Sequence, residues 1–235
     1  MSRIRAVTVD FYDTLVFHRD GRGRGALLVE YLEAQGLEHA PWEHAVLYDV
    51  FEGHEIDYAP HAADEVRAAY HLRLARRVFE RLRIPASDDE VSRHAGPLWE
   101  ILGPSCLDLF PDAVRTLEAL RADGYPVALI SNWQSGVRHY CDELGLGRWL
   151  DHVVGSGDLG VAKPDARIFA EACARLDVPP SDVLHVGDSL TDDYLGAEAA
   201  GLVPVLLARE REAAAGAARA VRRMDEIPEL LRGGV

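Results

Sequence analysis

The sequence predicts an α/β fold: a doubly wound parallel sheet that is interrupted after its first strand by a helical insertion. Five short apolar runs, most of them rich in β-branched residues and free of polar alternation, are typical of strands covered on both faces of a parallel sheet. Helical patterns separate the later runs, which is the alternation of a doubly wound domain. The stretch between the first two runs contains no convincing strand. The five runs are Ile4 to Val9, Val127 to Ile130, His152 to Val154, Val183 to Val186 and Val203 to Leu207.

The insertion begins soon after the first strand and extends from about Phe17 to Leu109. Its strongest signal is the run from Val66 to Leu82, which is rich in helix formers and places apolar residues four positions apart. Pro85 and then Ser87 to Glu90 are typical of a helix end followed by a helix start. From Gly21 to Gly25, three glycines alternate with two arginines, which favours a solvated loop.

The chain alternates strands and helices again from about Pro111 onward. The clearest helix runs from Asp165 to Leu176, where apolar residues recur at helical spacing just after a proline. An alanine-rich segment, Ala213 to Ala218, predicts a surface helix without chemistry. These patterns divide the chain into a discontinuous sheet domain, residues 1–16 and 110–235, and an inserted helical domain, residues 17–109.

The composition is that of an ordinary globular protein with an acidic balance. The 235 residues are 48% hydrophobic and 27% charged, which permits a sizeable core and gives no argument for extensive disorder. A formal net charge of −14 argues against a general nucleic-acid surface, because proteins that grip phosphate backbones concentrate Lys and Arg on one face. It does not exclude a small anionic substrate, because the nearest charges dominate the field within a site.

No targeting, membrane or disulfide signal stands out. The N-terminal segment lacks the charged start, apolar run and cleavage site of a signal peptide, and no later apolar stretch could span a bilayer. We therefore expect a cytoplasmic protein with neither a nucleic-acid nor a membrane partner. Cys106, Cys141 and Cys173 are far apart and form no CxxC pair, which predicts buried free thiols.

Chemically useful side chains follow four of the predicted strands. Asp10 and Asp188 each come just after a strand, as do Ser131 and Asn132, and Lys163 lies in the loop after another. The loops beyond the carboxyl ends of parallel strands collect ligand-binding groups, so these residues are expected at one site. A divalent cation needs oxygen ligands, and a transferred phosphoryl group needs donors and positive charge around its oxygens. Each residue alone is more typical of a cap, a turn or a surface charge, but their order and spacing together favour a shared chemical role over these separate ones.

In this order and spacing, the sequence resembles the haloacid dehalogenase-like superfamily of hydrolases. The resemblance runs over nearly all of the predicted sheet domain and rests on four segments. They are Asp10 to Thr14, Ser131-Asn132, Lys163-Pro164-Asp165, and Gly187-Asp188-Ser189 with Asp193. The resemblance implies a Rossmann-like core formed by residues 1–16 and 110–235, with residues 17–109 as a mobile helical cap.

The resemblance also implies how the chain would handle a phosphoryl group. Asp10 would be the nucleophile, which forms an aspartyl-phosphate that water then hydrolyses. Lys163 would neutralise the nucleophile and the phosphate. Thr14, Ser131 and Asn132 would bind the phosphoryl oxygens. The implied substrate is a small phosphorylated metabolite, because a closing cap limits access to the site.

Magnesium is the cofactor that the resemblance implies. Mg²⁺ would be held by the carboxylates of Asp10 and Asp188 and by the backbone carbonyl of Tyr12. Asp193 would complete this metal site or support a bound water.

Tyr12 departs from the pattern of the family's phosphatases. These enzymes usually have a second aspartate two residues after the nucleophile, which protonates the leaving alcohol and then activates water. Tyr12 stands at that position here. A phenol, with an ordinary pKa near 10, can donate a proton but is a poor base at neutral pH. Asp13 is one residue further along, where the family normally has a small residue that faces away from the substrate.

Two alternative functions follow from this departure. A tyrosine at position 12 also resembles the dehalogenases of the superfamily, in which the aspartate displaces halide from a 2-haloacid without a metal. Those enzymes lack the acidic pair of Asp188 and Asp193, which would repel the substrate's carboxylate unless a cation lay between them. A second alternative is a catalytically weakened protein that binds phosphate or regulates. Turnover distinguishes an enzyme from such a binding protein.

Overall fold

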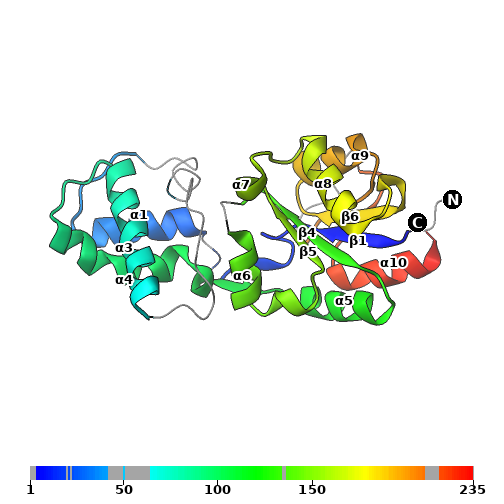
Figure 1. Ribbon diagram of the computed structural model, residues 1–235, viewed down its shortest axis with the longest axis horizontal. Helices are drawn as coiled ribbons and strands as arrows, with labels where there is room; N and C mark the ends of the chain where they lie inside the picture. Colours follow the sequence, from blue (N-terminus) through cyan, green and yellow to red (C-terminus); the bar gives the residue numbers. More distant parts are fainter. Residues whose placement is uncertain are drawn as a thin grey trace. The chain divides into compact units, whose positions relative to one another are not determined.

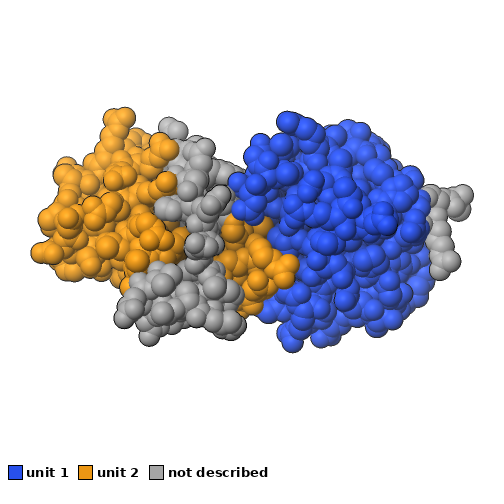
Figure 2. All heavy atoms as spheres, in the orientation of Figure 1, with its two compact units in different colours: residues 1–17, 109–133, 145–235 blue, residues 18–108, 134–144 orange. Residues whose placement is uncertain are grey.

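The computed structural model describes residues 4–19, 21, 23–41, 50, 64–133, 136–209 and 217–234, with residues 64–67 described by their backbone alone. The chain forms two compact units, which Figure 2 shows in different colours. The first unit comprises residues 1–17, 109–133 and 145–235, and the second comprises residues 18–108 and 134–144. The division into a catalytic core and a cap concerns the roles of these segments and stays a prediction.

The first unit is built on a six-stranded sheet in which all neighbouring strands are parallel (Figure 1). The strand order is β5-β4-β1-β6-β7-β8, so that the first strand lies in the interior of the sheet between β4 and β6. The parallel-sheet fold and the five predicted strands are thereby confirmed. The strands are β1 (Ala6–Val9), β4 (Val127–Ser131), β5 (His152–Gly155), β6 (Val183–Gly187), β7 (Val203–Leu207) and β8 (Ala220–Val221).

Helices cover both faces of this sheet, which explains why its strands lack polar alternation. Every residue of β1, β4 and β6 is buried. Figure 1 shows α8 and α9 on one side of the strands and α5 and α10 on the other. These four helices are α5 (Pro111–Ala122), α8 (Ala166–Leu176), α9 (Gly196–Ala199) and α10 (Ile227–Gly233).

Helix α8 confirms the helix that the sequence predicts after Pro164. Its N-cap is Asp165, whose side chain accepts a hydrogen bond from the backbone N–H of Arg167. Its apolar face is buried, and it packs against β4 and β5. Shorter elements complete the described part of the unit: η2 (Leu146–Arg148), α7 (Ser156–Leu159), η3 (Pro180–Asp182), the π-helix η4 (Leu190–Leu195) and η5 (Met224–Glu226).

The second unit is mainly helical in its described residues. Its helices are α1 (Arg24–Ala34), α3 (Asp64–Arg81), α4 (Asp88–Leu102), η1 (Pro104–Cys106) and α6 (Val137–Glu143). Helix α4 begins where the sequence predicts a helix start, because Ser87 and Glu90 form a reciprocal capping box. Apolar residues of α1, α3 and α4 form its hydrophobic core, which includes Leu28, Leu74 and Leu98.

Two expectations for the insertion are corrected. The sequence predicts no strand there, yet β2 (Val16–His18) and β3 (Leu107–Leu109) pair at its two ends. Each has three residues, too few for a recognisable pattern. The loop predicted over Gly21 to Gly25 also ends early, because α1 begins at Arg24, whose buried guanidinium donates to the carbonyl of Leu102 at 3.2 Å. Arg22 lies outside the described residues, as does most of the helix predicted over Ala213 to Ala218.

The predicted state of the cysteines is confirmed: Cys106, Cys141 and Cys173 are all buried and free. Burial raises the pKa of the Cys173 thiol to about 11, so it is an unreactive thiol at neutral pH. In the part of the chain that the structure describes, no helix is both long and apolar enough to cross a bilayer.

Candidate active site

The predicted site residues gather where the interior strands of the sheet end. Asp10 directly follows β1, Ser131 ends β4, and Asp188 directly follows β6. These strands are neighbours and run in the same direction, so their carboxyl ends meet at one edge. The backbone N–H of Asp10 donates to the carbonyl of Val186 at 2.9 Å, which fastens the end of β1 to β6. All of these residues belong to the first unit.

Lys163 bridges two of the acids. Its ammonium Nζ lies 2.6 Å from Oδ1 of Asp10 and 2.5 Å from Oδ1 of Asp193. The Lys163 side chain is 3% exposed and those of the acids are at most 9% exposed, so the three charges interact with little screening by water. The structure thus joins the predicted nucleophile, the predicted lysine and one predicted metal-site acid in a single buried ion-pair cluster.

Asp10, Asp188 and Asp193 form a group that fits a divalent cation. Each offers a carboxylate oxygen, and these oxygens lie within 4.8 Å of one another. Hard cations such as magnesium prefer carboxylate oxygens, and three neighbouring negative charges repel each other unless positive charge lies among them. Lys163 supplies one positive charge against three carboxylates, so one further cation is electrostatically favoured here.

The pKa values reflect this imbalance. Burial raises the pKa of Asp10 to about 7; the charges of Asp193 and Asp188 add to the rise, and Lys163 opposes it. For Asp193, burial also favours the protonated form, but Lys163 and His185 outweigh it and hold the pKa below its usual range. Burial likewise opposes the charge of Lys163, yet Asp10 and Asp193 keep its pKa above the ordinary value. The lysine is therefore charged, and Asp193 is the more strongly ionised of its two partners.

The π-helix η4 turns Asp193 back toward the strands. Ser189 caps this helix by accepting a hydrogen bond from the N–H of Asp192, and its own N–H donates to Oδ2 of Asp193 at 3.0 Å. Gly187 makes room for the returning side chain, because a Cβ at this position would overlap the Asp193 carboxylate. The glycine before Asp188 is thus required by close packing.

His185 supports Asp193 from inside the sheet, a contact that the sequence does not reveal. Its Nε2 lies 3.1 Å from Oδ1 of Asp193, and its Nδ1 lies 2.9 Å from the hydroxyl of Thr8. Burial lowers the pKa of His185, although Asp193 acts in the opposite direction. A neutral imidazole that accepts from Thr8 and donates to Asp193 satisfies all three groups. The only sequence signal for this role is a polar residue within an apolar strand run.

Asn132 holds the backbone of Lys163. Its amide Nδ2 donates to the Lys163 carbonyl at 2.9 Å, and its Oδ1 accepts from the Lys163 N–H at 2.7 Å. Both ends of the side-chain amide are thus engaged by one residue, which fixes the loop that carries the lysine. The predicted contact of Asn132 with substrate stays a prediction, as does that of the buried Ser131.

Thr14 and Asp13 occupy contrasting places after the nucleophile. The Thr14 side chain is fully buried, and its hydroxyl has no hydrogen-bond partner in the part of the chain that the structure describes. A buried hydroxyl without a partner is costly, and a ligand oxygen would satisfy it. Asp13 is exposed and has a positive φ of 59°, a conformation that glycine and aspartate adopt more easily than most residues.

Tyr12 lies beside a tryptophan that the sequence does not single out. The Tyr12 ring is half-buried and its centroid is 6.1 Å from that of Trp133, which also meets Phe11 edge-on at 5.0 Å. Trp133 is fixed through its backbone, because its N–H donates to the Ser156 hydroxyl at 3.0 Å and that hydroxyl donates back to its carbonyl. Phe11, Tyr12 and Trp133 therefore form an aromatic cluster that begins at the residue after Asp10.

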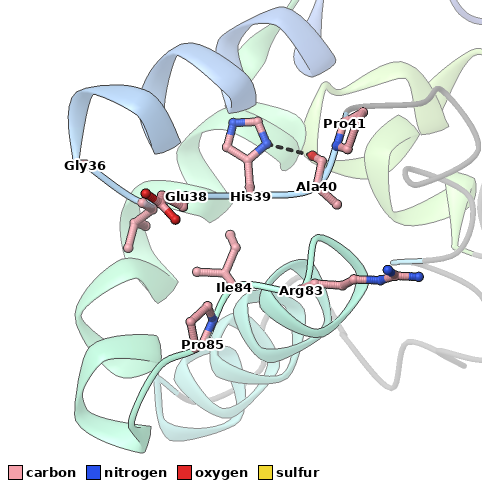
Figure 3. Close-up of a pocket in the computed structure, with 9 residues that line it drawn as sticks. Gly36, Glu38, His39, Ala40, Pro41, Arg83, Ile84 and Pro85 are labelled. Atoms are coloured by element: carbon pink, nitrogen blue, oxygen red, sulfur yellow. Dashed lines mark hydrogen bonds between the residues drawn. The ribbon is translucent and has the colours of Figure 1, made fainter.

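A separate pocket lies within the second unit, between the segment after α1 and the segment after α3 (Figure 3). It has a volume of about 630 Å³ and is lined by Gly36 to Pro41 and by Arg83 to Pro85. The ring of His39 is hydrogen-bonded to the neighbouring Ala40 carbonyl at 2.8 Å. No residue predicted to act on a phosphoryl group lines this pocket.

Comparison with known proteins places these features in a family. A sequence model of haloacid dehalogenase-like hydrolases matches residues 4–201, a range that includes every predicted site residue. The chain is 36% identical over 106 residues to the glyceraldehyde 3-phosphate phosphatase of Methanopyrus kandleri, a match that covers 43% of each chain. It is 34% identical over 130 residues to (S)-2-haloacid dehalogenase 1 of a Pseudomonas species, covering 53% of this chain and 57% of the relative.

The fold is similar to solved structures over its full length. The crystal structure of 2-haloacid dehalogenase from Pseudomonas syringae pv. Tomato aligns with a TM-score of 0.66 and 26% identity, over 99% of this chain and 100% of that one. The matches to the curated relatives span only about half of their length, and those relatives include both phosphatases and dehalogenases.

Proposed function

Because the chain belongs to the haloacid dehalogenase-like hydrolases, we propose that it hydrolyses a small phosphorylated metabolite, with Asp10 as the nucleophile and magnesium as the cofactor. The observation that carries this proposal is the group of three carboxylates, Asp10, Asp188 and Asp193, whose oxygens lie within 4.8 Å of one another. A metal-free dehalogenase would have to bring a substrate carboxylate to this negative group. A phosphatase would use the same group to hold the cation that accompanies phosphate.

The reaction proceeds in two displacements on phosphorus. A carboxylate oxygen of Asp10 attacks the phosphorus in line, and the bond from phosphorus to the ester oxygen breaks as that oxygen takes up a proton from solvent and leaves as the alcohol. Water then attacks the phosphorus of the aspartyl-phosphate, which releases inorganic phosphate and restores the carboxylate. Asp10, Asp188 and the carbonyl of Tyr12 would hold magnesium, with support from Asp193, and the ion would supply positive charge that offsets repulsion between carboxylate and phosphate.

Lys163 contributes positive charge to both displacements. Its ammonium contacts Asp10 at 2.6 Å, and Asp193 and the amide of Asn132 hold the ammonium and the backbone in place. Such fixed charge needs no reorganisation as negative charge moves from the nucleophile to the phosphoryl oxygens. The buried Thr14 hydroxyl donates to one of these oxygens, a bond that would satisfy the group left without a partner.

A substrate screen tests this function. Phosphorylated metabolites and 2-haloacids are each assayed with magnesium and with excess chelator. We expect release of inorganic phosphate that requires magnesium. Asp10→Asn keeps the shape of the side chain and removes the nucleophilic charge, so turnover should be lost while the far-UV circular dichroism stays unchanged. Substantial turnover by Asp10→Asn would remove Asp10 from its role.

A 2-haloacid dehalogenase is the second candidate, because Tyr12 stands where phosphatases of the family have an aspartate. Full activity on 2-haloacids in excess chelator would favour it. Saturable, magnesium-dependent phosphate binding without any product would instead assign a binding role.

A further inference from the structure

We propose that Arg209 is a positioning residue that fixes the backbone of Thr14 and so aims the Thr14 hydroxyl at the phosphoryl group. The inference rests on the proposed phosphatase function and adds to it a residue outside the four segments of the family resemblance. Arg209 follows β7, at the far side of β6 from the nucleophile's strand in the sheet order.

The guanidinium of Arg209 contacts three residues of the first unit at once. Its Nη2 donates to the Thr14 carbonyl at 2.8 Å. Its Nη1 donates to both carboxylate oxygens of Asp112, at 3.0 and 2.8 Å. The guanidinium carbon lies 3.7 Å from the ring centroid of Phe110, so the charged group also stacks on an aromatic face. The planar guanidinium carries several N–H donors in a fixed geometry, so it can make these contacts at the same time.

Asp112 is itself firmly held, so it can serve as the fixed end of this arrangement. It is the second residue of α5, where the helix terminus favours a negative charge, and Oδ2 accepts from the N–H of Met224 at 2.9 Å. Its side chain is 8% exposed and that of Arg209 is 19% exposed. Burial alone would raise the pKa of Asp112, but the Arg209 and Met224 hydrogen bonds outweigh it and keep the carboxylate charged.

Thr14 is the residue through which this arrangement reaches the reaction. The short segment after Asp10 folds on itself, with the N–H groups of Leu15 and Val16 both donating to the carbonyl of Phe11. The Thr14 carbonyl instead accepts from Arg209, and the Thr14 hydroxyl is the buried group left for a ligand. Holding the carbonyl therefore fixes the Thr14 backbone from which the side chain and its hydroxyl extend. A donor displaced by about 1 Å from its productive place can cost on the order of 10²-fold in rate.

Arg209→Lys tests the proposal in kinetics, since a lysine has one ammonium nitrogen in place of the two guanidinium nitrogens that hold Asp112 and the Thr14 carbonyl separately. We expect kcat/KM for a phosphate ester to fall about 10- to 100-fold. The matched control is Arg115→Lys, which alters another arginine–aspartate pair of α5, 3.0 Å from Asp225, without a contact to Thr14. In a protein that already carries Thr14→Val, Arg209→Lys should lower kcat/KM little further, because the hydroxyl that Arg209 positions is already absent.

Amide resonances test the same contact without any turnover. The chain contains only four threonines, Thr8, Thr14, Thr116 and Thr191, so threonine labelled with ¹⁵N gives four backbone signals, and Thr14→Ser identifies one of them. Arg209→Lys should shift the Thr14 signal and leave those of Thr8 and Thr191 in place.

The outcomes separate this inference from the proposed function. An unmoved Thr14 signal, or wild-type kcat/KM in Arg209→Lys, overturns the inference while the phosphatase function stands. If Arg209→Lys lowers kcat/KM equally with and without the Thr14 hydroxyl, the inference is overturned as well, since Arg209 would then act by a route other than Thr14. A wild-type protein that releases no phosphate from any ester overturns the function, and a shifted Thr14 signal would still support the positioning contact.

Discussion

Tyr12 stands two residues after the proposed nucleophile, where the family's phosphatases usually have an aspartate that would assist both chemical steps. If Asp10, magnesium and Lys163 act as proposed, the missing acid/base group should slow protonation of a poor leaving group most. We expect the wild-type protein to hydrolyse aryl phosphates much faster than alkyl phosphates. Tyr12→Asp should raise turnover of alkyl phosphates by part of the roughly 10²- to 10⁴-fold that a positioned acid/base group supplies.

Tyr12→Phe is the matched control for this prediction. It keeps the ring that packs near Trp133 and removes only the hydroxyl, so it separates proton transfer by the phenol from packing. Steady-state rates on matched aryl and alkyl esters decide the question. If Tyr12→Asp gains nothing on alkyl esters while it stays folded and binds magnesium, another group supplies the proton, and the exposed Asp13 is the next to be tested.

Gly187 is a second residue whose substitution has a sharp expected result. A Cβ at Gly187 would overlap the Asp193 carboxylate, so Gly187→Ala should displace Asp193 and release Lys163 from one of its two partners. We expect kcat to fall about 100-fold or more. Gly96→Ala in α4 is the control, because a Cβ there meets nothing within 4 Å. Wild-type kcat in Gly187→Ala would show that Asp193 need not occupy this position.

At the residue scale, the sequence predicted which groups meet but not how each is used. The ends of neighbouring parallel strands had to bring Asp10 and Asp188 together, and the structure places them in one carboxylate group. The amide of Asn132 could not be assigned from sequence, because its two hydrogen bonds go to the Lys163 backbone, a contact of loop geometry. His185 offered only the weak signal of a polar residue in an apolar run.

At the scale of elements, α1 and α4 of the second unit are joined by a titratable contact. The Tyr31 hydroxyl lies 2.6 Å from Nδ1 of His94, which is buried against Phe79. Burial, together with Arg93, lowers the pKa of His94 below its ordinary value of 6.5. The unfolded chain therefore takes up a proton at a higher pH than the folded chain does. Stability from this group is complete above pH 6.5 and is lost as the pH falls through the lower, folded-state pKa.

Acidification should accordingly destabilise the protein, and one histidine can be tested by itself. Asn at position 94 keeps a hydrogen-bond acceptor near Nδ1 but cannot titrate, so His94→Asn should show a weaker loss of unfolding free energy with falling pH. A single group contributes at most about 1.4 kcal/mol per pH unit. Urea unfolding at intervals from pH 7.5 to 5.5 measures the two slopes. Identical slopes would mean that His94 carries none of the dependence.

The sequence predicted a strand correctly where burial along the whole strand leaves a continuous run of apolar residues. Strands β1, β4 and β6 are buried along their whole length, so their sequences are continuous apolar runs. The short strands β2, β3 and β8 leave no such pattern, because pairing over two or three residues depends on the tertiary neighbour and not on their own sequence.

For the whole molecule, the carboxylate group couples cation binding to stability. Asp10, Asp188 and Asp193 repel one another in the folded chain and separate on unfolding, so a cation that binds the folded state stabilises it. We expect magnesium at 100 times its dissociation constant to add about 2.7 kcal/mol to the free energy of unfolding. Asp188→Asn should abolish this gain and leave the magnesium-free protein at least as stable as wild type, because one repelling charge is gone.

Thermal unfolding in magnesium chloride, and in sodium chloride of equal ionic strength with chelator, measures the effect. The melting temperature in sodium chloride gives the effect of general charge screening, which is subtracted from the effect of magnesium chloride. A melting temperature that rises equally in both salts would argue against a specific cation site at these carboxylates.

The overall architecture was predictable because alternation of strand and helix permits few arrangements. The contacts that tune the site were not, since they join segments far apart in the chain. Thr8 meets His185 across 177 positions, and Thr14 meets Arg209 across 195. No local pattern records such a pairing, and only the assembled sheet reveals it.

The interior position of β1 also has a consequence for biosynthesis. A ribosome makes β1 before β4, and β4 before β6, yet β1 lies between these two later strands. A nascent chain that has emerged only as far as β5 therefore carries an apolar β1 with one edge still open, an exposed edge of the kind that chaperones shield. The carboxylate of Asp10 can meet Asp193 only after β6 and the residues up to Asp193 have left the exit tunnel. We expect that chains arrested before residue 183 has been made will bind chaperones. Chains that have emerged from the tunnel beyond Asp193 should bind chaperones less.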